Sequence, residues 1–423
     1  MKSPVTKALL SEADSNSNAL PEKKRALSSK RIWILTVSFM LIIVLALSSM
    51  LFFLSSSKPQ KKFQNPLLAS VSQDHAKPKR KNLKEVMGFL PSWAAFPDID
   101  FIKDKGLTQI IYFGLGVTSS GQIIRYNEEN NLVAEWSIFT SSEFREFVSS
   151  AHKKGIKVVV ALKNFDNTSI DTLISNESST KILTNELVAI ARKYDIDGYN
   201  LDFEYFTDSE FPTKTHFNKF LGTLNNALEE SNPGLSLSID MNALATISDA
   251  AYDMPKIGEL VDFIIIMGYD YHLPTSQVAG PIAPLYSVGG SHSVSRTVDS
   301  LSGKVPFQKV VLGVPFYGYE WATYGKYWGS QTIPGSGALA SYKRVKKLLE
   351  DRNDIKTNWD VRTQTPWLVY IEEGSIKQIH YEDSRSIAAK VGFVRDHSMA
   401  GIAIWALGYE GSYTDIWKGI VDE

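Results

Sequence analysis

From residue 83 onward, short apolar runs alternate with stretches of amphipathic helical pattern. The apolar runs are nearly continuous and rich in Val, Ile, Leu and Phe, which is typical of parallel strands buried on both faces. They predict strands over 86–90, 109–114, 157–162, 198–203, 235–241, 262–268, 309–316 and 400–405. Helical patterns separate them, for example over 143–153, 180–193, 215–230 and 386–396.

Eight such β/α units predict an α/β fold, a (β/α)8 TIM barrel, over 85–423. A doubly wound open sheet is the alternative, but no Gly-rich phosphate-binding turn follows the first strand. The interval between the seventh and eighth strands is much longer than the others. We expect a small α+β insertion there, at about 320–380, that forms one wall of a substrate cleft. It contains a helical stretch near 342–352 and strand-like runs over 367–371 and 376–380.

The first 84 residues have a different pattern. Residues 1–31 are polar, Ser-rich and basic at their end, which predicts a disordered cytoplasmic tail. Residues 32–54 hold 23 positions without a charge, long enough for a transmembrane helix in a lipid bilayer. Residues 55–84 then read as a basic linker. We therefore expect a single-pass membrane protein with a cytoplasmic N-terminus and the globular part outside the cytoplasm. A cleaved signal peptide is the rival interpretation, but the long leader and the lack of an A-x-A site favour a retained anchor.

Charge and cysteine content narrow the possible functions. The net charge of −1 combines a basic first 84 residues, with 15 Lys/Arg and four Asp/Glu, and an acidic remainder with 30 and 42. The acidic globular part argues against a nucleic acid partner bound through a basic face. The chain has no cysteine, which excludes disulfides and thiolate metal sites.

The run YDIDGYNLDFEY over 194–205 carries the candidate chemistry. If 198–203 is a strand, Asn200, Asp202 and Glu204 share one face, about 6–7 Å apart at each i, i+2 step. Two neighbouring carboxyl groups do not both ionise cheaply, so one is held protonated, as a general acid requires. Glu204, nearest the strand end, is the natural acid, with Asp202 behind it. A strand end with exposed acids is the usual reading of an isolated DxE triplet, but the apolar strand and the preceding Asp-Gly make this pattern more specific.

DGYNLDFE resembles the signature of glycoside hydrolase family 18, the chitinase family, whose usual form is DGxDxDxE. Asp197, Gly198, Asp202 and Glu204 match it. Asn200 stands where most members carry Asp, so the proton-sharing role of that first inner carboxylate is not carried over. Asn200 is expected to contact the substrate instead.

Other stretches resemble further family motifs. Tyr269 and Asp270 match MxYD, and the resemblance implies that Tyr269 binds the substrate's N-acetyl group and that Asp270 contacts the sugar and the acid. Trp405 resembles the tryptophan that forms the floor under the sugar. Tyr319 stands where relatives commonly carry Arg, and Lys163 lies where they show an SxGG motif. Residues in two more family-like stretches are expected to line the cleft, namely Phe89, Trp93, Tyr317 and Trp321.

The resemblance implies a membrane-anchored glycosidase that cleaves β-1,4-linked N-acetylglucosamine-containing polysaccharide, of chitin or peptidoglycan type, by substrate-assisted retaining catalysis. The alternative is a non-catalytic lectin on the same barrel, against which the retained Glu204 and Asp202 argue. A structural membrane protein with a decayed site is a third, weaker possibility. No cofactor is expected, and no metal site, because the histidines lack HExxH-type spacing. These are His75, His152, His216, His272, His292, His380 and His397.

Overall fold

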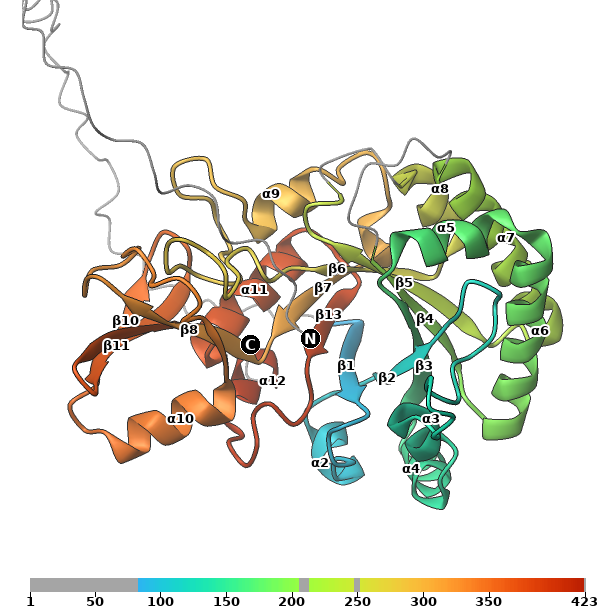
Figure 1. Ribbon diagram of the computed structural model, residues 1–423, viewed down its shortest axis with the longest axis horizontal. Helices are drawn as coiled ribbons and strands as arrows, with labels where there is room; N and C mark the ends of the chain where they lie inside the picture. Colours follow the sequence, from blue (N-terminus) through green and yellow to red (C-terminus); the bar gives the residue numbers. More distant parts are fainter. Residues whose placement is uncertain (1–82, 205–212, 247–251, 422–423) are drawn as a thin grey trace, which may run out of the picture. The chain divides into compact units, whose positions relative to one another are not determined.

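The computed structural model of the protein describes residues 83–204, 213–246 and 252–421. Eight parallel strands close into a barrel in the order β1-β13-β7-β6-β5-β4-β3-β2 (Figure 1). Their bounds are β1 Glu85–Pro91, β2 Gln109–Gly116, β3 Lys157–Asn164, β4 Gly198–Phe203, β5 Ser236–Asn242, β6 Phe263–Met267, β7 Val310–Pro315 and β13 Gly401–Trp405. The predicted closed parallel barrel is confirmed, and an open doubly wound sheet is excluded.

Helices connect the barrel strands and cover their outer faces (Figure 1). Several begin with a side chain that accepts a hydrogen bond from a backbone N–H of the first turn, as Ser141, Asp166, Asn176 and Asp383 do. The helices are α2 Ile99–Asp104, α3 Ala134–Phe139, α4 Ser142–Lys153, α5 Asn167–Ser175, α6 Glu177–Tyr194, α7 Thr213–Ser231, α8 Met254–Leu260, α9 Val294–Asp299, α11 Ser384–Asp396 and α12 Lys418–Val421, with 3-10 turns η1 Phe307–Lys309 and η2 Asp415–Trp417.

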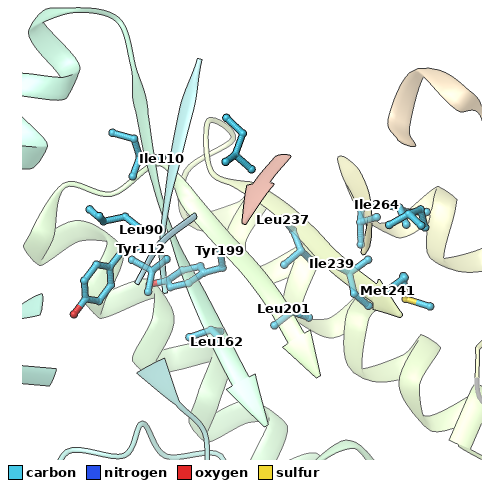
Figure 2. Packing of buried hydrophobic residues seen from close by; sticks show 14 of the residues in the cluster. Leu90, Ile110, Tyr112, Leu162, Tyr199, Leu201, Leu237, Ile239, Met241 and Ile264 are labelled. Atoms are coloured by element: carbon cyan, nitrogen blue, oxygen red, sulfur yellow. The ribbon is translucent and has the colours of Figure 1, made fainter. Parts of the chain in front are cut away.

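The core has two layers because alternate side chains of each strand point to opposite faces. Figure 2 shows the outer layer, between strands and helices, with Leu90, Ile110, Tyr112, Leu162, Tyr199, Leu201, Leu237, Ile239, Met241 and Ile264 labelled. The inner layer fills the barrel with Met87, Phe89, Ile111, Phe113, Val159, Ala161, Ile265, Val311 and Ala403. The barrel interior is therefore a packed core, and polar groups inside it need a specific reason.

Two residues fix the start of β4. A carboxylate oxygen of Asp197 accepts a hydrogen bond from the Val158 N–H (2.7 Å) and contacts His152 Nε2 (2.8 Å). Gly198 has a φ of 149°, and a Cβ there would lie 2.1 Å from the Ser236 carbonyl oxygen. The Asp-Gly pair of the sequence motif thus sets the register of β4 against β3 and β5, which places the residues that follow.

A second, antiparallel sheet lies in the chain between β7 and β13, with strand order β10-β11-β12-β8-β9. It is the part drawn in orange and red around β8, β10 and β11 in Figure 1. Its strands are β8 Tyr317–Thr323, β9 Ala338–Ser341, β10 Thr357–Asp360, β11 Thr365–Glu372 and β12 Ser375–His380, and helix α10 Tyr342–Asp351 follows β9. Strand β8 begins two residues after β7 ends, so this sheet is built directly from the carboxyl end of a barrel strand.

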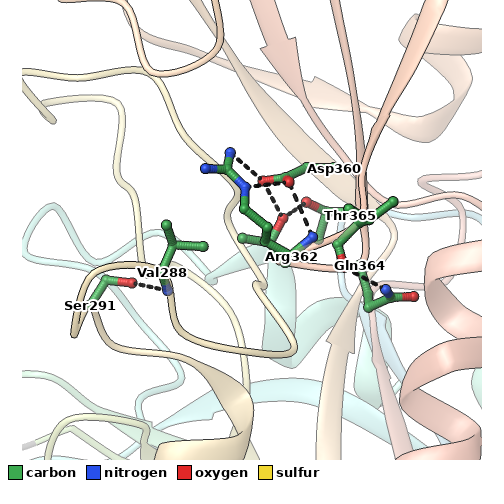
Figure 3. Close-up of polar contacts among 8 residues, drawn as sticks. Val288, Ser291, Asp360, Arg362, Gln364 and Thr365 are labelled. Carbon is green, nitrogen blue, oxygen red and sulfur yellow. Dashed lines mark hydrogen bonds and ion pairs between the residues drawn. The ribbon is translucent and has the colours of Figure 1, made fainter. Parts of the chain in front are cut away.

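Polar contacts hold this second sheet against the loop that follows β6. In the turn between β10 and β11, the buried Asp360 pairs with Arg362 at 2.9 Å and accepts a hydrogen bond from the Thr363 hydroxyl at 3.1 Å (Figure 3). The Thr363 carbonyl accepts a hydrogen bond from the Leu285 N–H at 2.9 Å. The loop after β6 is thereby fixed to the second sheet.

The expectation of a single-pass membrane protein needs correction. No helix within 83–204, 213–246 or 252–421 is both long and apolar enough to cross a membrane. The predicted cytoplasmic tail, transmembrane helix over 32–54 and basic linker lie outside the described residues. The localisation prediction and the bilayer partner are therefore not retained.

A buried ion pair joins helix α11 to the short segment between β12 and α11, and it gives a stability prediction. Lys390 Nζ lies 2.6 Å from a Glu382 carboxylate oxygen, and both side chains are fully buried. Burial raises the pKa of Glu382 to about 7, although Lys390 lowers it. Lys390→Met leaves this carboxyl group without its cation, so we expect the free energy of unfolding in urea to fall by about 3–5 kcal/mol.

The matched control is the double variant Lys390→Met/Glu382→Leu. Replacing both partners by apolar residues removes the unpaired charge, so this variant should regain most of the lost stability. An equal loss in the single and double variants would contradict the assignment of the cost to the unpaired carboxyl group.

Candidate active site

The predicted acid face of β4 lies at the inside and end of the barrel. Asn200 and Asp202 are buried, with 0% and 4% exposure, and they alternate with Tyr199 and Leu201, which pack in the outer layer. Glu204 follows the strand, is half-buried, and its N–H donates to the Asn164 carbonyl at 3.1 Å. The three side chains predicted to share a face therefore do so.

Burial and mutual repulsion raise the pKa values of these carboxyl groups. Burial raises the pKa of Glu204, and the charge of Asp270 raises it further. The pKa of Asp202 is raised well above its usual range by burial and then by the charges of Asp240 and Glu204, while Lys163 opposes the shift. A half-buried carboxyl group with a raised pKa suits proton donation near neutral pH.

Tyr269 and Asp270 follow β6 directly. Asp270 has a φ of 62°, a left-handed conformation that Asp tolerates better than most residues. It accepts hydrogen bonds from the hydroxyls of Tyr317 (2.6 Å) and Tyr319 (3.0 Å). Burial raises the pKa of Asp270 while these two hydrogen bonds lower it.

The Tyr269 hydroxyl keeps its proton and can therefore donate a hydrogen bond. Burial, followed by the charges of Asp240, Asp270, Asp202 and Glu204, raises its pKa well above the usual value. Because all four carboxyl groups act on one hydroxyl, the structure brings the predicted residues of β4 and β6 into one electrostatic cluster, and the phenol stays protonated.

Sequence reasoning missed Asp240, on β5. The Asn200 amide nitrogen donates to its Oδ1 at 2.9 Å and to the Ser238 hydroxyl at 3.1 Å. Burial raises the pKa of Asp240 to about 8. The signal was present: in SLSIDMN, over 236–242, polar and apolar residues alternate as they do in β4.

Lys163, at the end of β3, is a second missed neighbour. It is in register with Asp202, lies 3.1 Å from a Glu135 carboxylate oxygen, and its Nζ is 5.5 Å from the centre of the Phe113 ring. Lys163 thus provides positive charge beside the buried acids.

Aromatic rings form the opposite side of the barrel end. Trp405, the last residue of β13, lies 5.4 Å from the Phe89 ring and 4.8 Å from Phe113. Trp93 is 61% exposed and contacts Phe113 edge-on at 6.2 Å. Trp405 and Trp93 offer apolar surface of the kind that suits the C–H face of a sugar ring. Phe113, which supports both, was not among the predicted residues.

Metal ligation has no geometric basis in the part of the chain that the structure describes. Within 83–204, 213–246 and 252–421, no group of three or more His, Asp or Glu side chains is placed to hold a metal ion.

This geometry agrees with a comparison against protein families. The model of glycosyl hydrolases family 18 matches residues 85–410, which include every candidate site residue named in this subsection. The chain belongs to this family. Family 18 is a family of glycosidases, so the prediction of a glycosidase from the sequence motifs is confirmed.

Individual relatives are distant. The cortical fragment-lytic enzyme of Bacillus subtilis (strain 168) is 25% identical over 290 residues, which cover 67% of this chain and 63% of that protein. Probable chitinase 2 of Drosophila melanogaster is 29% identical over 271 residues, 60% of this chain and 56% of that protein. The family 18 chain thus spans about three-fifths of the length of these relatives.

Solved structures support the fold. The crystal structure of Ostrinia furnacalis Group IV chitinase in complex with allosamidin matches with a TM-score of 0.69 and 20% identity. The match covers 81% of this chain and 98% of that one. At this identity the likeness establishes the family 18 barrel and not the ligand.

Three residues expected to line the cleft are buried. Phe89, Tyr317 and Trp321 are 2%, 3% and 0% exposed. Phe89 packs beneath Trp405, and Tyr317 donates its hydroxyl to Asp270. The Trp321 indole N–H points to the Leu273 carbonyl at 3.2 Å. These side chains pack against or hydrogen-bond to neighbouring residues in the structure, and their contact with a sugar stays a prediction.

The hydrogen bond from Tyr317 gives a prediction for Asp270. Since it stabilises the ionised carboxylate, Tyr317→Phe should raise the pKa of Asp270. A ¹³C NMR titration of labelled Asp carboxyl carbons, assigned with Asp270→Asn, measures the shift. Tyr342→Phe, which removes a hydroxyl bound to Asp415, is the matched control and should leave the pKa of Asp270 in place. An unchanged or lower pKa in Tyr317→Phe would contradict this role.

Proposed function

We propose that this protein hydrolyses β-1,4-linked N-acetylglucosamine-containing glycans with net retention, using the substrate's own acetamido group as nucleophile. The observation that carries the proposal is the convergence of Glu204, Asp202, Tyr269 and Asp270. Each of these groups lies close enough to another for its charge to affect the partner's proton affinity. That cluster lies opposite the aromatic surface of Trp405.

The first step breaks the glycosidic bond. Glu204 gives its proton to the glycosidic oxygen as the bond to the anomeric carbon breaks, and the acetamido carbonyl oxygen forms a new bond to that carbon. Asp202 accepts a hydrogen bond from the N–H of the resulting oxazolinium ion through the carboxyl oxygen that carries no proton. Tyr269 donates its hydroxyl to the acetamido oxygen and orients it. Asp270 holds the sugar and raises the pKa of the acid.

The second step returns the proton. The Glu204 carboxylate, now a general base, takes a proton from water as the water oxygen attacks the anomeric carbon. The ring of the oxazolinium ion opens and regenerates the acetamido group. Two inversions at one carbon give net retention, and Glu204 is again protonated.

The substrate class follows from the required acetamido group. Chitin and peptidoglycan both contain β-1,4-linked N-acetylglucosamine, and the relatives named above include a chitinase and a cortical fragment-lytic enzyme. A glycan-binding lectin is the second candidate, because Asn200 replaces a usual carboxylate. Turnover separates the two proposals.

The test uses the full chain with chitin oligomers, purified peptidoglycan and de-N-acetylated chitin oligomers, followed by product analysis. We expect products from at least one acetylated glycan and none from the de-N-acetylated oligomers, which lack the nucleophile. Glu204→Gln should lower turnover by about 10²–10⁴-fold or more while retaining affinity for the glycan, because an amide cannot donate the proton but keeps the shape.

The matched control is Glu129→Gln, at an exposed position in a turn, which should keep both turnover and binding. Unchanged turnover in Glu204→Gln would contradict the assignment of the acid. Glycan binding by the wild type without products would favour the lectin.

A further inference from the structure

Inside the barrel, next to the acid row of β4, lies a buried carboxyl group that the sequence motif does not explain, that of Asp240. Asn200 on β4 pairs in register with Ser238 on β5. Two residues further along both strands, Asp202 and Asp240 therefore lie at the same level inside the barrel. They are 4% and 5% exposed, so an acid on β5 faces the acid row of β4.

Hydrogen bonds give the Asn200 amide a fixed orientation. Its nitrogen donates to Asp240 Oδ1 at 2.9 Å and to the Ser238 hydroxyl at 3.1 Å, which uses both amide hydrogens. Its oxygen is buried with no hydrogen-bond partner among the residues that the structure describes, and so is Asp202 Oδ1. The amide oxygen can only accept a hydrogen bond, and a protonated Asp202 on the same strand face is a donor.

The titratable groups of the cluster that contains Asp240 come from three other strands. Asp202 lies on β4 and Glu204 follows it, Tyr269 and Asp270 follow β6, and Lys163 lies near the end of β3. Glu204 raises the pKa of Asp240, and the hydrogen bond from Asn200 lowers it. Asp240 in turn raises the pKa values of Asp202 and Tyr269. Asp240 is thus part of the same cluster although it touches no sugar in the proposed mechanism.

We propose that Asp240 is a positioning residue that provides, from β5, the second inner carboxyl group that family 18 usually carries at the position of Asn200. This inference rests on the proposed function. Asp240 holds Asn200 with its amide oxygen free for Asp202. Its own carboxyl group shares the retained protons with Asp202 and Glu204. The carboxyl group is thus provided by β5 and not by β4, while the chemistry beside Asp202 is kept.

The test compares the full-length wild type with Asp240→Asn and with the exchange variant Asn200→Asp/Asp240→Asn, which returns the carboxyl group to β4. Asp240 raises the pKa of Asp202, so replacing its carboxyl group by an amide lowers the pKa of Asp202. Asp240→Asn should therefore move the basic limb of the kcat–pH profile down by about one pH unit and lower kcat by about 10- to 100-fold. The exchange variant should regain the limb and most of kcat.

Ser238→Ala is the matched control, since it removes the other acceptor of the Asn200 amide but no charge. It should leave the basic limb in place, whatever it does to stability. If Asp240→Asn leaves the limb unmoved, or the exchange variant is no better than the single variant, the inference is wrong. Should Asp240→Asn fail to fold, the exchange variant decides alone, because it must fold and turn over substrate.

A second readout does not need turnover. The pKa of Asp240 in the folded state, about 8, is above the usual unfolded value of about 3.9. The stability it contributes is therefore present at low pH and lost as pH rises toward 8. Urea unfolding from pH 4 to 8 should show a smaller loss in Asp240→Asn and a restored loss in the exchange variant. If the wild type hydrolyses nothing but this pattern holds, the proposed function fails and the placement of the carboxyl group stands.

Discussion

Burying several carboxyl groups in one place, with too little positive charge to balance them, is the constraint on which this site depends. Asp202 and Asp240 are buried inside the barrel, and Glu204 and Asp270 lie at its end. Lys163 is the cation that acts on Asp202, and its charge is shared with Glu135. Since unpaired buried charge is costly, the cluster retains protons. The surroundings of the site therefore raise the pKa values of its carboxyl groups, which suits a site that must deliver a proton to a sugar oxygen.

The rest of the fold keeps these acids in place despite their repulsion. Asp197 and Gly198 fix the start of β4, so that the acid row points inward. On the other side, Tyr317 and Tyr319 of β8 hold Asp270 through their hydroxyls. Strand β8 belongs to the second sheet, which is itself bonded to the loop after β6. The second sheet thus contributes to the site by anchoring Asp270.

The fold was largely predictable because each barrel strand is a continuous apolar run, and the predicted bounds agree with the observed strands within about two residues. Glu204, Asp202, Tyr269 and Asp270 were predicted because they lie in or just after strands in recognisable motifs. Asp240 was not, because the polar alternation of β5 matches no family motif, and its importance comes from its register with Asn200. The burial of Trp321 was not predictable from the sequence either. An aromatic residue near a barrel strand gives the same sequence pattern whether its ring faces a sugar or the core.

The central claim is that crowding of buried acids keeps a proton on Glu204. A ¹³C NMR titration of the Glu204 carboxyl carbon in the labelled full chain, assigned with Glu204→Gln, measures this directly. The account predicts a pKa clearly above the usual value of about 4.3 for Glu. A pKa at or below that value would show an ordinary ionised surface carboxylate and would contradict the account.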